Sequence, residues 1–218
     1  MAEVMPINFP LPSEAAAVTY DWADFAEGTG IKMFYLASTY GDNILTTNQI
    51  YSEEIEYDTG AHNLTAAYVK NFDVDYDLSA FNSPRTVRGT AYINFTGHGV
   101  EVGGNAYWYF TVKVIKWDGT TETEIGNATT RTFNGHDEGE YDLFALSIPL
   151  TTTHFAIGDI LRVTVEGYDK LYDATPATHR LIIGQDPMNR DGTYIIPSTD
   201  NPVSITQTKI WIPFKIDN

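Results

Sequence analysis

The sequence predicts an all-β protein: an antiparallel two-sheet β-sandwich of jelly-roll type with an extended N-terminal arm. Three observations support this class. Many short stretches alternate apolar and polar residues with a period of two, as half-buried strands do. Turn-forming Gly, Asn, Asp and Pro separate these stretches, and almost no segment has helical periodicity. We expect about eight to ten strands. A single long barrel and a two-domain split near Ser83-Pro84 are the alternatives.

The stretch 106–116 has the clearest alternation. Its large apolar residues fall at every second position and therefore share one face of a strand: Trp108, Phe110, Val112 and Val114. The dipeptide Asp118-Gly119 follows, and its glycine can supply the positive φ of a tight turn. The Thr-rich run 121–132 continues the chain. We therefore predict a β-hairpin here.

The same pattern predicts further strands along the chain. Before the hairpin they fall at 31–38, 44–55, 63–78 and 87–97. After it they fall at 144–150, 161–165, 179–184 and 209–216. In the last of these, alternate apolar residues form one face that we expect to close the core: Ile210, Ile212, Phe214 and Ile216. We assign residues 31–218 to one domain, because a chain of 218 residues can form one substantial core.

Residues 1–30 have a different character. Prolines recur near the start, where they remove amide donors and hold the backbone extended. Ile7, Phe9 and Leu11 lie between them and need a surface to cover them, either of this sandwich or of a neighbour. The Ala-rich stretch 13–25 favours a short helix with Ser13 as its cap. We expect an arm that docks the sandwich to its partner.

The composition limits the classes of partner. The chain has 29 Asp and Glu against 13 Lys and Arg, for a formal net charge of -16. This charge repels a phosphate backbone and disfavours nucleic-acid binding. The absence of cysteine removes disulfides and thiolate sites. No apolar run approaches the roughly 20 residues that span a bilayer, and no signal-peptide pattern is present. We expect a chain made in a cytoplasm, with no membrane partner.

Catalytic motifs are lacking in the sequence. No Gly-x-Ser-x-Gly element presents a serine nucleophile. The histidines stand singly, without the spacing of a compact metal site, so we interpret most of them as surface or loop residues: His62, His98, His136, His154 and His179. A pair of carboxylates for glycoside hydrolysis stays open, because its spacing is spatial. We predict a protein that is not an enzyme.

Three acidic groups are candidates for a cation site. Asp73, Asp75 and Asp77 share one face of a strand, where neighbours lie about 6–7 Å apart, too far for one ion without other ligands. Two loops hold the remaining candidates: Asp137, Glu138, Glu140 and Asp142, and then Asp186, Asn189 and Asp191. None matches the spacing of a calcium loop. We therefore expect solvated or ion-paired carboxylates and no cofactor, with calcium as the alternative.

Aromatic residues on outward faces are the other candidates. Four of them alternate with core positions in their strands or follow a strand: Tyr107, Tyr109, Trp117 and Trp211. Exposed Tyr and Trp can stack on sugars or bury against another subunit, and they are enriched in the cores of protein interfaces. We expect them to contribute to an interface, together with the apolar residues of the arm. Packing beneath loops of the same chain is the alternative.

Several stretches also resemble a known group of proteins. They are 20–38, 44–55, the pair 111–130 and 157–167, and the terminal 210–217. Together they resemble β-sandwich structural proteins of environmental tailed bacteriophages, of the head-decoration, head-fibre or appendage type. The resemblance covers most of the chain and implies no functional residue. It implies a virion component, and such proteins are often trimeric.

These inferences combine into one expectation of function. We predict a non-enzymatic virion structural protein, a capsid decoration or minor capsid protein. Its partners would be other virion proteins, the major capsid protein above all, and it would self-associate as a trimer. The expected location is the virion. A receptor- or carbohydrate-binding module of a phage tail or fibre is the alternative, with a glycan as its ligand.

Overall fold

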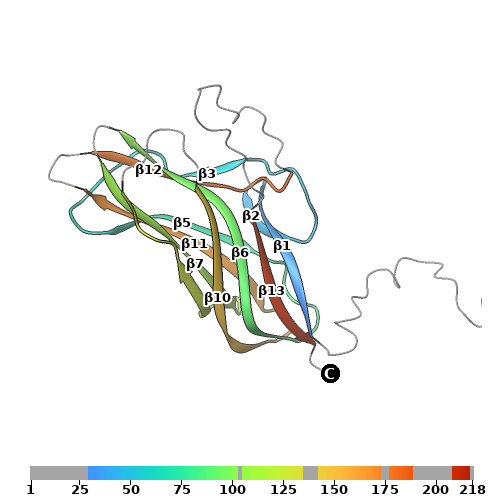
Figure 1. The fold of residues 1–218 in the computed structure, drawn as a ribbon. Helices are drawn as coiled ribbons and strands as arrows, with labels where there is room; N and C mark the ends of the chain where they lie inside the picture. The colour runs from blue at the N-terminus through green and yellow to red at the C-terminus, as the bar shows by residue number, and fades with distance from the viewer. Residues whose placement is uncertain (1–28, 103–104, 135–141, 173–176, 189–207, 217–218) are drawn as a thin grey trace, which may run out of the picture.

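The computed structural model describes residues 29–102, 105–134, 142–172, 177–188 and 208–216 (Figure 1). Within these ranges all regular structure is β-strand, so the all-β prediction is confirmed. The strands are β1 (Thr29–Thr39), β2 (Asp42–Thr46), β3 (Glu56–Asp58), β4 (His62–Asn63), β5 (Val69–Asp77), β6 (Arg85–Val102), β7 (Ala106–Trp117), β8 (Glu122–Thr129), β9 (Phe133–Asn134), β10 (Asp142–Phe155), β11 (Ile160–Leu171), β12 (Thr178–Gly184) and β13 (Lys209–Ile216).

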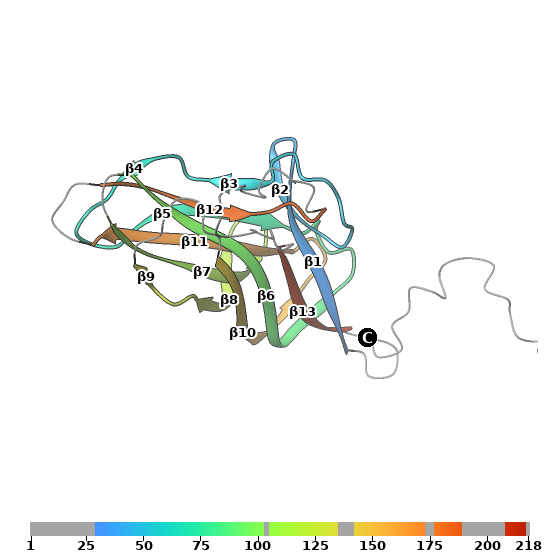
Figure 2. The same ribbon diagram turned by 45° about the horizontal axis from the view of Figure 1, so that its top comes forward.

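The strands form a sandwich of two layers (Figures 1 and 2). One layer is built on the long β6, which pairs with β10, β12 and β13, and β13 in turn pairs with β1. The other runs β5, β11, β7, β8. The ladders are antiparallel, as predicted, apart from one parallel pair between Ile44 of β2 and Asp77 of β5. That pair connects the two layers along one edge.

The core lies between the layers and follows the predicted alternation. Trp108, Phe110, Val112 and Val114 of β7 all have no exposed surface. The ring of Phe110 lies 5.8 Å from those of Phe95 on β6 and Phe144 on β10, so aromatic contacts cross from one layer to the other. Edge-on packing of this kind adds to the free energy gained by burying the rings.

The predicted hairpin joins β7 to β8. Gly119 has a φ of 94°, a conformation in which a side chain would be strained. Asp118 Oδ1 accepts hydrogen bonds from the backbone N–H groups of Thr120 at 2.9 Å and Thr121 at 2.7 Å. The aspartate therefore replaces backbone partners that the tight turn leaves unpaired.

Two predicted strands are shorter than the sequence pattern indicates. The run 44–55 is a strand only as far as Thr46, whose Oγ1 accepts a hydrogen bond from the Asn48 N–H at 3.1 Å and so turns the chain out of the sheet. In the run 63–78, the long strand begins at Val69. Asn63 belongs to the two-residue β4, which pairs with β12 instead, and residues 64–68 are not in a strand.

The predicted arm and short helix lie outside the described residues, as do Ile7, Phe9 and Leu11. The division between residues 1–30 and 31–218 therefore stays a prediction. Within the described part of the chain, no helix is long and apolar enough to cross a membrane.

Candidate functional site

Figure 2 shows β4, β12 and one end of β11 together at one end of the sandwich. Three polar side chains of these strands meet there. They are His62 on β4, Asp169 on β11 and His179 on β12. Asp169 belongs to one layer and His179 to the other. The cluster therefore joins the layers through side chains, at a place where the two sheets share no ladder.

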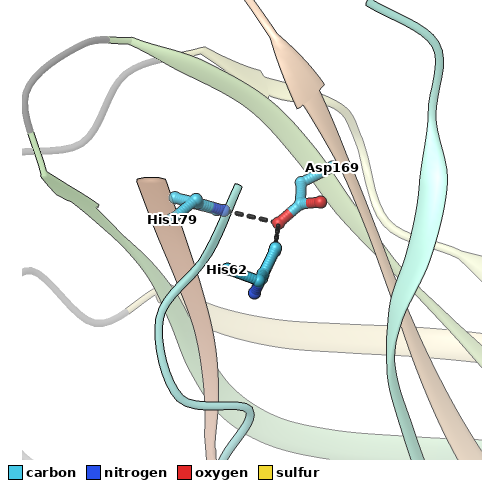
Figure 3. Close-up of side chains that lie close together, drawn as sticks. All are labelled: His62, Asp169 and His179. Atoms are coloured by element: carbon cyan, nitrogen blue, oxygen red, sulfur yellow. Dashed lines mark hydrogen bonds and ion pairs between the residues drawn. The ribbon is translucent and has the colours of Figure 1, made fainter. Parts of the chain in front are cut away.

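The carboxylate is the centre of the cluster (Figure 3). Asp169 Oδ2 lies 2.7 Å from His62 Nε2 and 2.7 Å from His179 Nδ1. The three atoms all fall within 4.8 Å of one another. The two imidazole rings are 6.2 Å apart at an interplanar angle of 79°. One oxygen atom thus accepts a hydrogen bond from each ring.

Asp169 is held ionised although it is buried. Burial by itself would raise the pKa of its carboxyl, but hydrogen bonds from His179, Asn71 and His62 outweigh that effect and lower the pKa below its ordinary value of 3.8. The Asn71 Nδ2 group donates to Asp169 Oδ1 at 2.7 Å. Both oxygens of the carboxylate are therefore satisfied, as a buried charge requires.

The two histidines differ in exposure. The side chain of His179 has no exposed surface, whereas that of His62 is 20% exposed. His62 Nδ1 faces the Gly60 carbonyl oxygen at 3.3 Å. His179 Nε2 is buried without a hydrogen-bond partner, next to Gly99 and Trp108. A Cβ at Gly99 would overlap His179 Nε2 and lie 2.7 Å from Trp108 Nε1, so glycine is needed for the ring to fit.

Strand pairing places the histidines on one face. His62 and His179 are directly opposite in the β4–β12 ladder, and opposite residues of a ladder point to the same side. Leu64 and Thr65, which directly follow β4, hold it in place through backbone hydrogen bonds. Leu64 N donates to the Ala177 oxygen at 3.0 Å, and Leu171 N donates to the Thr65 oxygen at 2.8 Å. The short β4 segment is therefore bonded to both β12 and β11.

This arrangement supports two kinds of chemistry. A carboxylate that orients an imidazole is the pair used for proton transfer, with His62 as the member that solvent reaches. Two imidazoles and a carboxylate are also a ligand set for a transition metal ion. Neither His62 nor His179 hydrogen-bonds a hydroxyl group, so neither belongs to a serine-type triad within the described residues.

The sequence interpretation of the histidines as isolated surface residues is wrong for His98 and His179, which are buried, and for His62, which pairs with His179. The sequence did contain an indication of this buried cluster. Asp169 falls in phase with the inward-facing Val165 of β11, and His179 falls in phase with Leu181 of β12. Titratable residues at core-facing positions indicate a buried polar cluster. The partner strand of β4 could not be inferred from local periodicity.

Of the predicted acidic residues that the structure describes, Asp73, Asp75 and Asp77 are ion-paired, and Asp142 is half-buried at the start of β10. Asp73 lies 2.5 Å from Lys70 Nζ, and Asp75 and Asp77 both pair with Arg162, at 3.1 Å and 2.7 Å. Asp186 is buried and accepts the Met188 N–H at 2.9 Å. The positions that fall outside the described residues are Asp137, Glu138, Glu140, Asn189 and Asp191.

The predicted aromatic residues are partly buried on outward faces and do not gather at one place. On the β7–β11 face, Tyr109 stacks on Tyr168 with ring centres 5.1 Å apart, and Tyr107 lies 5.0 Å from Tyr172. Trp117 lies beneath the Arg162 guanidinium at the other end of that layer, and Trp211 lies on β13 of the opposite layer. Their role in an interface stays a prediction.

Comparison with known proteins places the fold. No protein-family model and no curated protein matches the chain. Three similar solved structures are an aminopeptidase from a marine sediment Thaumarchaeota archaeon, an α-amino acid ester hydrolase and a CocE/NonD family hydrolase from Staphylococcus aureus. In that order, their TM-scores are 0.55, 0.51 and 0.50, and their sequence identities to this chain are 11%, 13% and 12%. The alignments cover 86%, 84% and 85% of this chain and 37%, 36% and 37% of the respective enzymes. The chain thus spans little more than a third of the length of each enzyme.

These likenesses correct the predicted function. The expected non-enzymatic virion structural protein, and with it the alternative of a tail module that binds a receptor or carbohydrate, is contradicted because three structures that share the fold are hydrolytic enzymes. The prediction that the chain is not an enzyme is contradicted on the same ground. The resemblance to phage proteins, the virion partners and the virion location stay untested.

Proposed function

We propose that this chain is the β-sandwich unit of a hydrolase that cleaves ester or amide bonds. The observation that carries the proposal is the alignment of 84–86% of the chain with 36–37% of each of three such enzymes. The described residues hold a His–Asp pair but no hydroxyl nucleophile bonded to it. The nucleophile would therefore come from a catalytic unit that works together with the sandwich.

The test is to isolate the tagged chain from its natural source and to assay it beside the purified recombinant chain. Substrates are aminoacyl p-nitrophenyl esters and aminoacyl p-nitroanilides, and a fluorophosphonate probe labels serine nucleophiles in parallel. We expect hydrolysis and a labelled catalytic unit in the isolated material, and much less hydrolysis by the recombinant chain. An isolate of the tag alone is the control. The proposal would be contradicted if the isolated material does not hydrolyse these substrates and shows no labelled protein that is absent from this control.

We also propose that the chain self-associates through the outer face of β10, β6, β13 and β1. Ile31, Tyr92 and Leu143 are 61%, 51% and 60% exposed. Trp211 extends this apolar surface, because it lies opposite Tyr92 in the β13–β6 ladder. Exposed apolar surface of this kind is typical of interaction sites. The predicted trimer would bury this face.

A further inference from the structure

The buried carboxylate of Asp169 needs a positive charge that the described lysines and arginines do not provide. Among the described residues its ion-pair partners are His62 and His179, and a neutral imidazole carries no charge. A buried ion without a counter-charge is costly, far more so than a hydrogen-bonded neutral group. The cluster is therefore a place where a cation would be bound with a gain in stability.

The donor atoms indicate which cation. Two imidazole nitrogens and one carboxylate oxygen within 4.8 Å are the ligands of zinc and its neighbours among the first-row transition metals. Calcium prefers six to eight oxygen ligands, so the cluster does not suit the calcium ion that the sequence left open. We propose that His62 Nε2, Asp169 Oδ2 and His179 Nδ1 bind one divalent first-row transition metal ion, of which zinc is the type.

Binding exchanges hydrogen bonds for metal bonds. Each nitrogen now lies 2.7 Å from Asp169 Oδ2, whereas two ligands of one tetrahedral zinc ion lie about 3.3 Å apart. The carboxylate must withdraw by roughly half an ångström when the ion enters. The proton of each neutral ring moves to its other nitrogen, and a charged ring releases one proton to solvent.

The surroundings of two of the ligands, His62 and Asp169, suit this change. The Gly60 oxygen faces His62 Nδ1 at 3.3 Å and can accept the proton that a metal-bound ring carries there. Asn71 holds the other carboxylate oxygen at 2.7 Å. Metal-binding histidines and carboxylates ordinarily have such outer partners. The partly exposed His62 gives the ion a route from solvent and leaves a further coordination position on that side for water.

A metal ion here would fasten the β4 segment to the sandwich. His62 lies on a strand of only two residues, while Asp169 and His179 lie on long strands of the two layers. One ion bound to all three would connect three chain segments that are distant in sequence. Because the unfolded chain does not hold these ligands together, metal binding would stabilise the folded state.

The experiment uses the full chain after dialysis against EDTA. Titration with zinc chloride in a calorimeter should show one site, cobalt chloride should give the visible absorption of four- or five-coordinate Co(II), and zinc should raise the melting temperature. Replacement of a ligand, as in His62→Ala or Asp169→Asn, should weaken binding by at least about 100-fold, and Asn71→Ala by ~10- to 100-fold. His154→Ala, on β10 outside the cluster, should bind zinc as the original chain does, and calcium chloride should have no effect.

Either of two results would overturn the proposal. One is that the chain does not bind one zinc ion per molecule, and the other is that His62→Ala binds zinc as tightly as the original chain. The His62→Ala variant matters because His62 is partly exposed, and its replacement threatens the fold less than replacement of the buried Asp169. Circular dichroism of each metal-free variant checks that it is folded. The proposal does not depend on hydrolysis, since binding and thermal stability are measured without substrate.

Discussion

Asp169 on β11 accepts a 2.7 Å hydrogen bond from His179 Nδ1 on β12, and neither side chain has any exposed surface. This contact joins the two layers of the sandwich at the end where β4 also attaches. Because a charge-assisted hydrogen bond between buried groups is stronger than a neutral one, the pair should matter for stability even without a metal ion.

The first prediction concerns that carboxylate. Asp169→Asn keeps the shape of the side chain but removes its charge and places an NH₂ group or a weaker acceptor against two imidazoles. We expect the metal-free protein to lose about 3 kcal/mol of unfolding free energy, measured by urea denaturation. Asp73→Asn makes the same chemical change in an exposed ion pair with Lys70 and should cost less than about 1 kcal/mol. Equal losses in the two variants would contradict a special role for Asp169.

The second prediction concerns Gly99. A Cβ there would overlap His179 Nε2 and lie 2.7 Å from Trp108 Nε1, so Gly99→Ala must displace one of the two rings. We expect a loss of about 1–3 kcal/mol from overpacking and a change in tryptophan fluorescence. Gly119→Ala is the comparison, because nothing lies within 4 Å of its added Cβ and only its φ of 94° is strained. That variant should be destabilised without a change in fluorescence from Trp108.

The sequence could predict the parts of the fold that depend on local alternation, and it could not predict the site. Trp108 and Phe110 are buried because residues two apart in a strand point to the same face, which here is the face toward the core. The meeting of His62 with His179 depends on the pairing of β4 with β12, segments far apart in the chain. Local pattern carries no information about that register. The inward phase of Asp169 was readable, but its partners were not.

The third prediction tests self-association. Tyr92→Lys places a charge in the centre of the outer face of β10, β6, β13 and β1, where burial against another copy would require its desolvation. We expect light scattering to give a larger species for the original chain, three times its 24.3 kDa if it is a trimer, and a smaller one for the variant. Tyr40→Lys changes a residue that is 94% exposed in the β1–β2 turn and should leave the mass unchanged. A monomer at micromolar concentration for the original chain would contradict the prediction.

The last prediction concerns the stability of the protein in acid, through Glu166. Burial would raise the pKa of this carboxyl, but hydrogen bonds from Lys113, Tyr168 and Lys70 together outweigh it and hold the pKa below its ordinary value of 4.5. Lys113 Nζ lies 2.8 Å from Oε2 and Lys70 Nζ lies 3.1 Å from Oε1. The folded state therefore binds the proton more weakly than the unfolded state does.

For a group whose pKa is lowered by folding, the stabilisation is fully present above the unfolded value of 4.5 and is lost as the pH falls from there through the folded pKa. Urea denaturation between pH 7 and pH 3 should accordingly show a decline below pH 4.5 that is shallower in Glu166→Gln, because the variant has no proton to take up. Glu124→Gln is the control: Glu124 is 41% exposed and 3.8 Å from Lys113, so its replacement should leave the acid slope unchanged. If Glu166→Gln declines as steeply as the original chain, the network around Glu166 does not contribute to acid sensitivity, and other carboxylates must account for it.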